Sequence, residues 1–61
     1  MIFQTYRMQQ LLHHDPILRS TYHEIFAYIN NEEQALRFLF EQYVIKEPIF
    51  QNAYLHLTHP S

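Results

Sequence analysis

Glycine is absent from all 61 residues of this sequence. Turns of types I′, II and II′ need a positive φ that glycine adopts most easily, so a hairpin-rich β fold would lack its turn residues. The three prolines stand at positions 16, 48 and 60, at the boundaries of apolar periodic segments. Both features favour short, capped connections between helices. We therefore expect residues 1–61 to form a single small all-α domain, a bundle of three to four short helices.

The clearest helix signal covers residues 15–30. Asp15 can cap the first turn with its carboxylate, and Pro16 suits the first helical position, where no N–H is needed. At 100° per residue the apolar positions fall on one half of the cylinder. This face consists of Ile17, Leu18, Thr21, Tyr22, Ile25, Phe26, Tyr28 and Ile29. A face this wide indicates burial against at least two neighbours, so we expect the other helices to pack around this one.

A second helix is predicted over residues 31–46. Asn31 with Gln34 three residues later resembles a capping box, and the acidic residues that follow Asn31 favour the positive end of a helix. The link to the helix at 15–30 is short, so the two should form a central helical hairpin. The main apolar face of this helix is Ala35, Leu36, Leu39, Phe40 and Tyr43.

The two ends of the sequence allow two interpretations. Residues 3–13 fit a helix that is apolar on two sides, and residues 48–57 fit a short helix that begins at Glu47-Pro48. The alternative is extended structure, because residues 2–8 are rich in strand-forming types and residues 53–59 alternate. Two such strands could pair around the hairpin and give a mixed fold. We prefer helices at about 3–13, 15–30, 31–46 and 48–57.

Ten aromatic side chains, five Phe and five Tyr, are more than a chain of this length buries easily. The chain has no Cys, so no disulfide can reinforce its small core. Some aromatic residues should therefore remain at the surface and mark a contact site. A homodimer is the simplest way to cover them, and binding to another protein is the next. We expect a dimer that also binds a partner protein.

The predicted contact site centres on Phe38 and Ile45. They lie off the main face of the helix at 31–46 and are seven positions apart, which aligns them along a regular helix. One interpretation is that the first or last helix covers them. The functional interpretation is an exposed anchor pair for another protein, because aromatic anchors dominate interface energetics. The full set of predicted partner-binding residues is Phe38, Ile45, Glu41, Arg37, Phe3 and Tyr6, with Arg37 and Glu41 setting orientation at the rim.

The charge distribution disfavours nucleic acid as a ligand. Four Lys and Arg against six Asp and Glu give a formal charge of −2, which leaves no basic footprint. A helix-turn-helix arrangement of residues 15–30 and 31–46 is the less favoured alternative. Its recognition helix would begin Asn31-Glu32-Glu33 and would bring carboxylates to the phosphates. We expect no nucleic-acid partner.

Neither metal chemistry nor catalysis is predicted. His56 and His59 have a spacing that can share a metal on a helix, but Pro60 interrupts that helix and no third ligand follows from spacing. No role is assigned to His13, His14 or His23. There is no cysteine nucleophile, and Ser20 has no glycine-rich elbow around it. We expect no metal, no cofactor and no enzymatic activity.

The predicted function is a non-enzymatic protein–protein interaction module, a regulator, inhibitor or adaptor that binds a larger protein. The alternative is an obligate homodimer with no separate partner.

No apolar run approaches the roughly 20 residues of a membrane span, and the polar faces lack rows of Lys and Arg for anionic lipid. The N-terminus lacks the pattern of a signal peptide, so we expect a cytoplasmic protein.

Overall fold

The computed structural model describes residues 1–59 and contains only helices in that range. The elements are α1 (Thr5–His14), α2 (Pro16–Ile29), α3 (Glu32–Leu39), the π-helical turn η1 (Phe40–Val44) and α4 (Pro48–Leu57). The all-α prediction is confirmed. The mixed fold is wrong over residues 2–8 and 53–59, because Thr5 already begins α1 and α4 continues to Leu57. The predicted helix at 31–46 is wrong in one respect, since it changes from α to π geometry at Phe40.

Side-chain caps fix the boundaries of α2 and α3 at the predicted places. One carboxylate oxygen of Asp15 accepts the backbone N–H groups of Ile17 and Leu18 at 3.0 and 3.1 Å. The side-chain oxygen of Asn31 accepts the N–H of Gln34 at 2.9 Å. Asn30 takes the left-handed conformation, with φ of 57°, and ends α2. Asn tolerates this conformation better than most residues, so the chain can reverse here without glycine.

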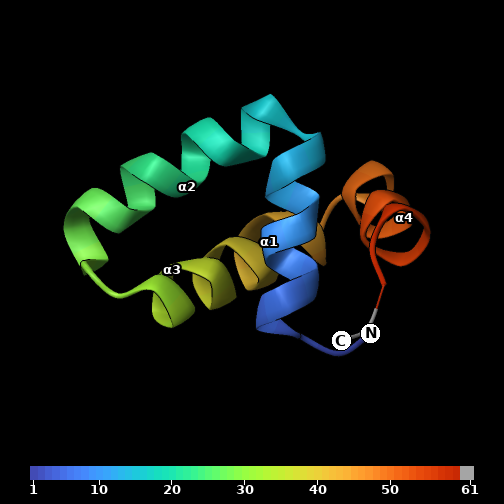
Figure 1. Cartoon of the computed structure of the whole chain (residues 1–61), viewed down its shortest axis with the longest axis horizontal. Coiled ribbons are helices and arrows are strands. Elements are labelled where there is room, and N and C mark those ends of the chain that lie inside the picture. Colours follow the sequence, from blue (N-terminus) through green and yellow to red (C-terminus); the bar gives the residue numbers. More distant parts are fainter. Residues whose placement is uncertain (60–61) are drawn as a thin grey trace.

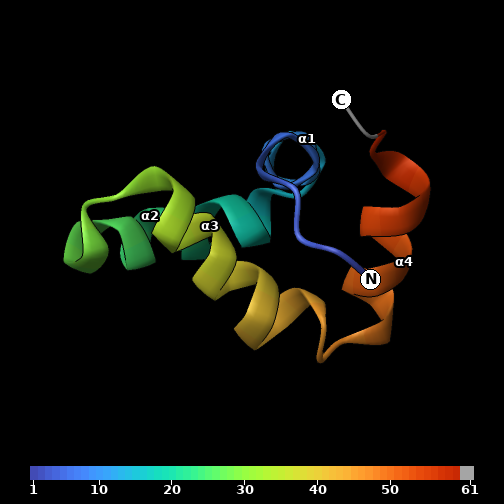
Figure 2. The ribbon, with the colours of Figure 1, turned by 90° about the horizontal axis from the view of Figure 1, so that it is seen from below.

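The helices form an antiparallel hairpin with two further helices across its open end. Figure 1 shows α2 and α3 side by side, joined at their far end by the short Asn30–Asn31 link. α1 crosses the other end of this hairpin, and α4 lies beyond α1. Figure 2, turned by 90°, shows α1 end-on above the hairpin with α4 upright beside it. α1 packs against α2, α3 and α4, and α4 also packs against η1.

The buried core is built from α1 and from the α3–η1 segment, with one large side chain each from α2 and α4. Its members are Met8, Leu11, Leu12, Leu18, Leu36, Leu39, Phe40, Val44 and Tyr54. The prediction that the other helices pack around α2 is wrong. α2 buries only Leu18 completely, and Ile17 and Tyr28 remain exposed. α1 takes the central place because Met8, Leu11 and Leu12 enter the core, while Arg7 and Gln10 form hydrogen bonds to the end of α4 and the residues that follow it.

The π turn changes which residues of this segment enter the core. The N–H of Ile45 donates to the carbonyl oxygen of Phe40, five residues earlier, at 3.0 Å. Such a turn holds one residue more than an α turn, so it rotates all later residues by about 100°. Tyr43, predicted on the core face, is 39% exposed, and Val44 is fully buried instead. The predicted alignment of Phe38 with Ile45 is also wrong, because it requires a regular helix between them.

Candidate functional site

The structure brings two of the six predicted contact residues together, Phe3 and Arg37. The guanidinium carbon of Arg37 lies 4.5 Å from the centroid of the Phe3 ring, and Arg37 also pairs with Glu33 at 3.7 Å. The Phe3 ring meets the ring of Phe40 edge-on, with centroids 5.5 Å apart. Both residues therefore help to hold the N-terminal segment against α3 and η1.

The other four predicted residues lie at the surface. Tyr6 is on α1, Phe38 is on α3, Glu41 is in η1 and Ile45 follows η1. Phe38 and Ile45 are 44% and 40% exposed, so the interpretation that the first or last helix covers them is wrong. The π turn lies between them, so the regular helical alignment that would place both on one line is interrupted.

Two arginines are used to cap helix C-termini. From α1, Arg7 donates from Nε to the Thr58 hydroxyl at 2.9 Å and from Nη2 to the carbonyl oxygen of Tyr54 at 3.2 Å. From α2, Arg19 donates to the carbonyl oxygens of Leu12 and His13, the last turn of α1, at 3.0 and 2.9 Å. Cations stabilise the negative end of a helix. Both guanidinium groups are therefore committed to the fold.

The cationic side chains of Lys and Arg all have partners within the molecule, whereas several carboxylates of the described residues have none. Lys46 donates to the side chain of Gln42 at 3.2 Å, and Arg37 is held as described, so every Lys and Arg of the chain has an internal partner. Within residues 1–59, by contrast, the carboxylates of Glu24, Glu41 and Glu47 take no part in a side-chain hydrogen bond or an ion pair with Lys or Arg. The charge that the molecule presents without an internal partner is therefore negative.

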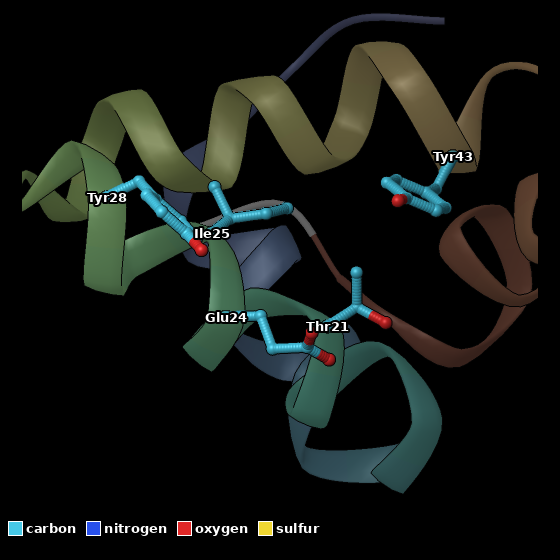
Figure 3. Close-up of a pocket in the computed structure, with 5 residues that line it drawn as sticks. All are labelled: Thr21, Glu24, Ile25, Tyr28 and Tyr43. Atoms are coloured by element: carbon cyan, nitrogen blue, oxygen red, sulfur yellow. The ribbon is translucent and has the colours of Figure 1, made fainter.

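One of these carboxylates borders an open hollow between α2 and η1. The hollow has a volume of about 230 Å³ and is lined by Thr21, Glu24, Ile25, Tyr28 and Tyr43. We call these five residues the tyrosine hollow. Figure 3 shows Tyr43 at the end of the α3–η1 segment, facing α2, from which the other four side chains come. Tyr28 is 88% exposed.

The pairing of Tyr28 with Tyr43 at a surface hollow does not follow from ideal helix periodicity. On ideal helices Tyr28 and Tyr43 both fall on apolar faces, which predicts burial. The signal that could have found Tyr43 is its neighbour Val44, because a helix that buries Val44 in line with Leu39 has to turn Tyr43 outward. For Tyr28, its place two residues before the Asn30–Asn31 link puts it beyond the part of α2 that α1 covers.

A larger, shallow hollow of about 300 Å³ lies on α1 alone, lined by Gln9, Gln10, His13 and His14. Over residues 1–59, no three side chains of His, Cys, Asp or Glu gather closely enough to hold a metal ion. None of the helices described is both long enough and apolar enough to cross a bilayer.

Tyr22, on α2 and outside the tyrosine hollow, has a shifted pKa. Burial raises the pKa of the Tyr22 hydroxyl above its ordinary value of 10.0, and the negative charge of Glu32 raises it further. Tyr22 therefore stays protonated and neutral at physiological pH.

Comparison of the chain with protein-family models, with curated protein sequences and with solved structures finds no match in any of the three.

Proposed function

We propose that this chain is a protein-binding module and that a partner protein docks at the tyrosine hollow. One observation carries the proposal: the π turn buries Val44 in the core and turns Tyr43 outward, across from α2. π turns are rare and occur frequently at functional sites. A regular helix would have put this phenolic ring into the core.

The distribution of aromatic residues supports the same function. Of the ten aromatic side chains, only Phe40 and Tyr54 are buried; four are half-buried and four are exposed. The exposed four are Tyr6, Tyr28, Phe38 and Tyr43. Tyrosine is enriched at protein interfaces because a large apolar ring can be buried while its hydroxyl finds a polar partner. The expectation that the chain keeps aromatic residues at its surface is confirmed.

Site-specific crosslinking in cells tests the proposal. The photoreactive residue p-benzoylphenylalanine is placed at position 28, at position 43 or, as a matched control outside the tyrosine hollow, at position 6. We expect one discrete crosslinked protein from positions 28 and 43 and none from position 6. The three positions are exposed tyrosines, so the replacement should leave the fold intact in each.

Two other results would replace the proposal. A product of twice the mass of the chain from positions 28 and 43 assigns the hollow to a homodimer. A crosslinked protein from position 6 alone moves the contact site to α1.

A further inference from the structure

We infer that the docking segment of the partner is basic and that one of its Lys or Arg side chains enters the tyrosine hollow with its cation at Glu24. This inference rests on the proposed function and adds the chemistry of the partner to it. It follows from three observations: the charge of the hollow, its lining and size, and the state of the chain's own cations.

The charge of the hollow is negative and has no internal partner. Glu24 is the one charged residue among the five that line it, and it is exposed on α2. The ion pair found among residues 1–59 joins Arg37 to Glu33, on α3, and does not involve Glu24. A partner cation placed here would gain a charge-assisted hydrogen bond to the carboxylate without displacing an existing one.

The residues that line the hollow suit both the cation and the aliphatic stem of a Lys or Arg side chain. The faces of tyrosine rings attract cations, and Ile25 offers an aliphatic surface for the methylene groups of a Lys or Arg stem. The volume of about 230 Å³ is below the roughly 300 Å³ at which small-molecule sites begin, so one side chain fits this space better than a cofactor does.

The chain's own cations argue against a second copy as the occupant. Arg7 and Arg19 are held by backbone carbonyl oxygens at helix ends, and Arg37 is held by Phe3 and Glu33. Using any of them at the hollow of another copy would remove a contact of the fold. Among the Lys and Arg side chains, Lys46 has only the exposed side chain of Gln42 as a partner, so its transfer to a second copy has to be tested.

The test is an NMR titration of the ¹⁵N-labelled protein with three blocked tripeptides. Acetyl-Leu-Arg-Leu-amide is compared with the same peptide carrying Gln or Glu in place of Arg. We expect the Arg peptide to shift the amide signals of Thr21, Glu24, Ile25, Tyr28 and Tyr43. We expect it to bind about three- to tenfold more tightly than the Gln peptide, with the Glu peptide weakest.

Two variants locate the effect. Glu24→Gln should remove most of the preference for the Arg peptide, leaving only the contribution of the tyrosine rings, and should leave the binding of the Gln peptide unchanged. The matched variant Glu47→Gln removes a carboxylate that likewise has no partner, from outside the hollow, and should keep the full preference.

The possible results separate the inference from the proposed function. If the Arg and Gln peptides bind the tyrosine hollow equally, or if Glu24→Gln keeps the preference, the basic partner is wrong and the docking site stands. If no peptide shifts these amides, the inference is overturned, and crosslinking decides the docking site independently. If the protein sediments as a dimer that both Glu24→Gln and Lys46→Gln dissociate, the occupant is a second copy and the inference is overturned.

Discussion

The hydroxyl of Tyr54 donates a hydrogen bond to the carbonyl oxygen of Ile2 at 2.9 Å. The oxygen of the Tyr54 hydroxyl in turn accepts the backbone N–H of Gln4, also at 2.9 Å. One fully buried side chain of α4 thus satisfies two backbone groups of the extended segment ahead of α1. Because Tyr54 also packs on Phe40, with ring centroids 5.2 Å apart, it connects both ends of the chain to the core.

Replacing Tyr54 by Phe should lower the free energy of unfolding by roughly 1–3 kcal/mol, because Ile2 and Gln4 each lose a partner while the ring remains. Urea denaturation followed by circular dichroism measures the loss, and amide exchange at Gln4 should accelerate with it. Tyr6→Phe is the control, since Tyr6 is half exposed, and its midpoint should not move. Equal midpoints for the two variants would show that the Tyr54 hydroxyl does not stabilise the fold.

Arg7→Lys should destabilise the end of α4 even though the charge is kept. The planar guanidinium reaches the Thr58 hydroxyl and the Tyr54 carbonyl together, and an ammonium group cannot reproduce that fork. We expect a loss of roughly 1–3 kcal/mol in the free energy of unfolding. Hydrogen exchange in the last turn of α4 should accelerate as well. Lys46→Arg, at an exposed site, should change neither quantity, and unchanged exchange in Arg7→Lys would contradict the capping role.

Deletion of Gln42 should be tolerated because the π turn contains one residue more than an α turn needs. The deletion allows a regular helix that still presents Leu39, Phe40 and Val44 to the core. We expect the free energy of unfolding to stay within about 1 kcal/mol of the wild type.

Deletion of Ser20 is the matched comparison, since it removes an exposed polar residue from a regular α-helix. It would rotate the later part of α2 by about 100° and turn Tyr22, Ile25 and Ile29 away from α3. We expect a loss of about 3 kcal/mol or more, measured by thermal or urea unfolding. If the two deletions are equally damaging, η1 is not an insertion into an α-helix.

The raised pKa of Tyr22 predicts a loss of stability at alkaline pH. A folded-state pKa above the unfolded value of 10.0 means that the folded protein holds this proton more tightly. The resulting stabilisation is complete below pH 10 and disappears as the pH rises through the folded pKa. Urea unfolding at pH 9 and at pH 11 should show the decrease. Tyr22→Phe should make it less steep, and an unchanged slope in Tyr22→Phe would contradict the role of this hydroxyl.

The helix boundaries could be predicted because they depend on neighbouring residues. Asp15 before Pro16 caps α2, and Asn31 three residues before Gln34 caps α3, with no help from the rest of the chain. The left-handed Asn30 is equally local. These signals also gave the hairpin, since a two-residue link leaves two helices little choice but to pack together.

The tyrosine hollow could not be predicted because the π turn is a tertiary effect. An ideal helix puts Tyr43 on the core face, and only the fit of Val44 among the buried side chains of α1 and α4 favours the extra residue. The contacts of Arg7 have the same origin, since they join residues 47 to 51 positions apart. Spacing within one helix carries no information about either.

The contact between Tyr54 and Ile2 also bears on the order in which the chain folds. The α2–α3 hairpin needs only a short loop to close, whereas the bonds from α4 to the N-terminal segment close a loop of almost the entire polypeptide and have the highest entropic barrier. We expect the hairpin to form early and this closure to come last. Native-state opening should run in the reverse order, with residues 1–4 and α4 detaching together as a single cooperative unit.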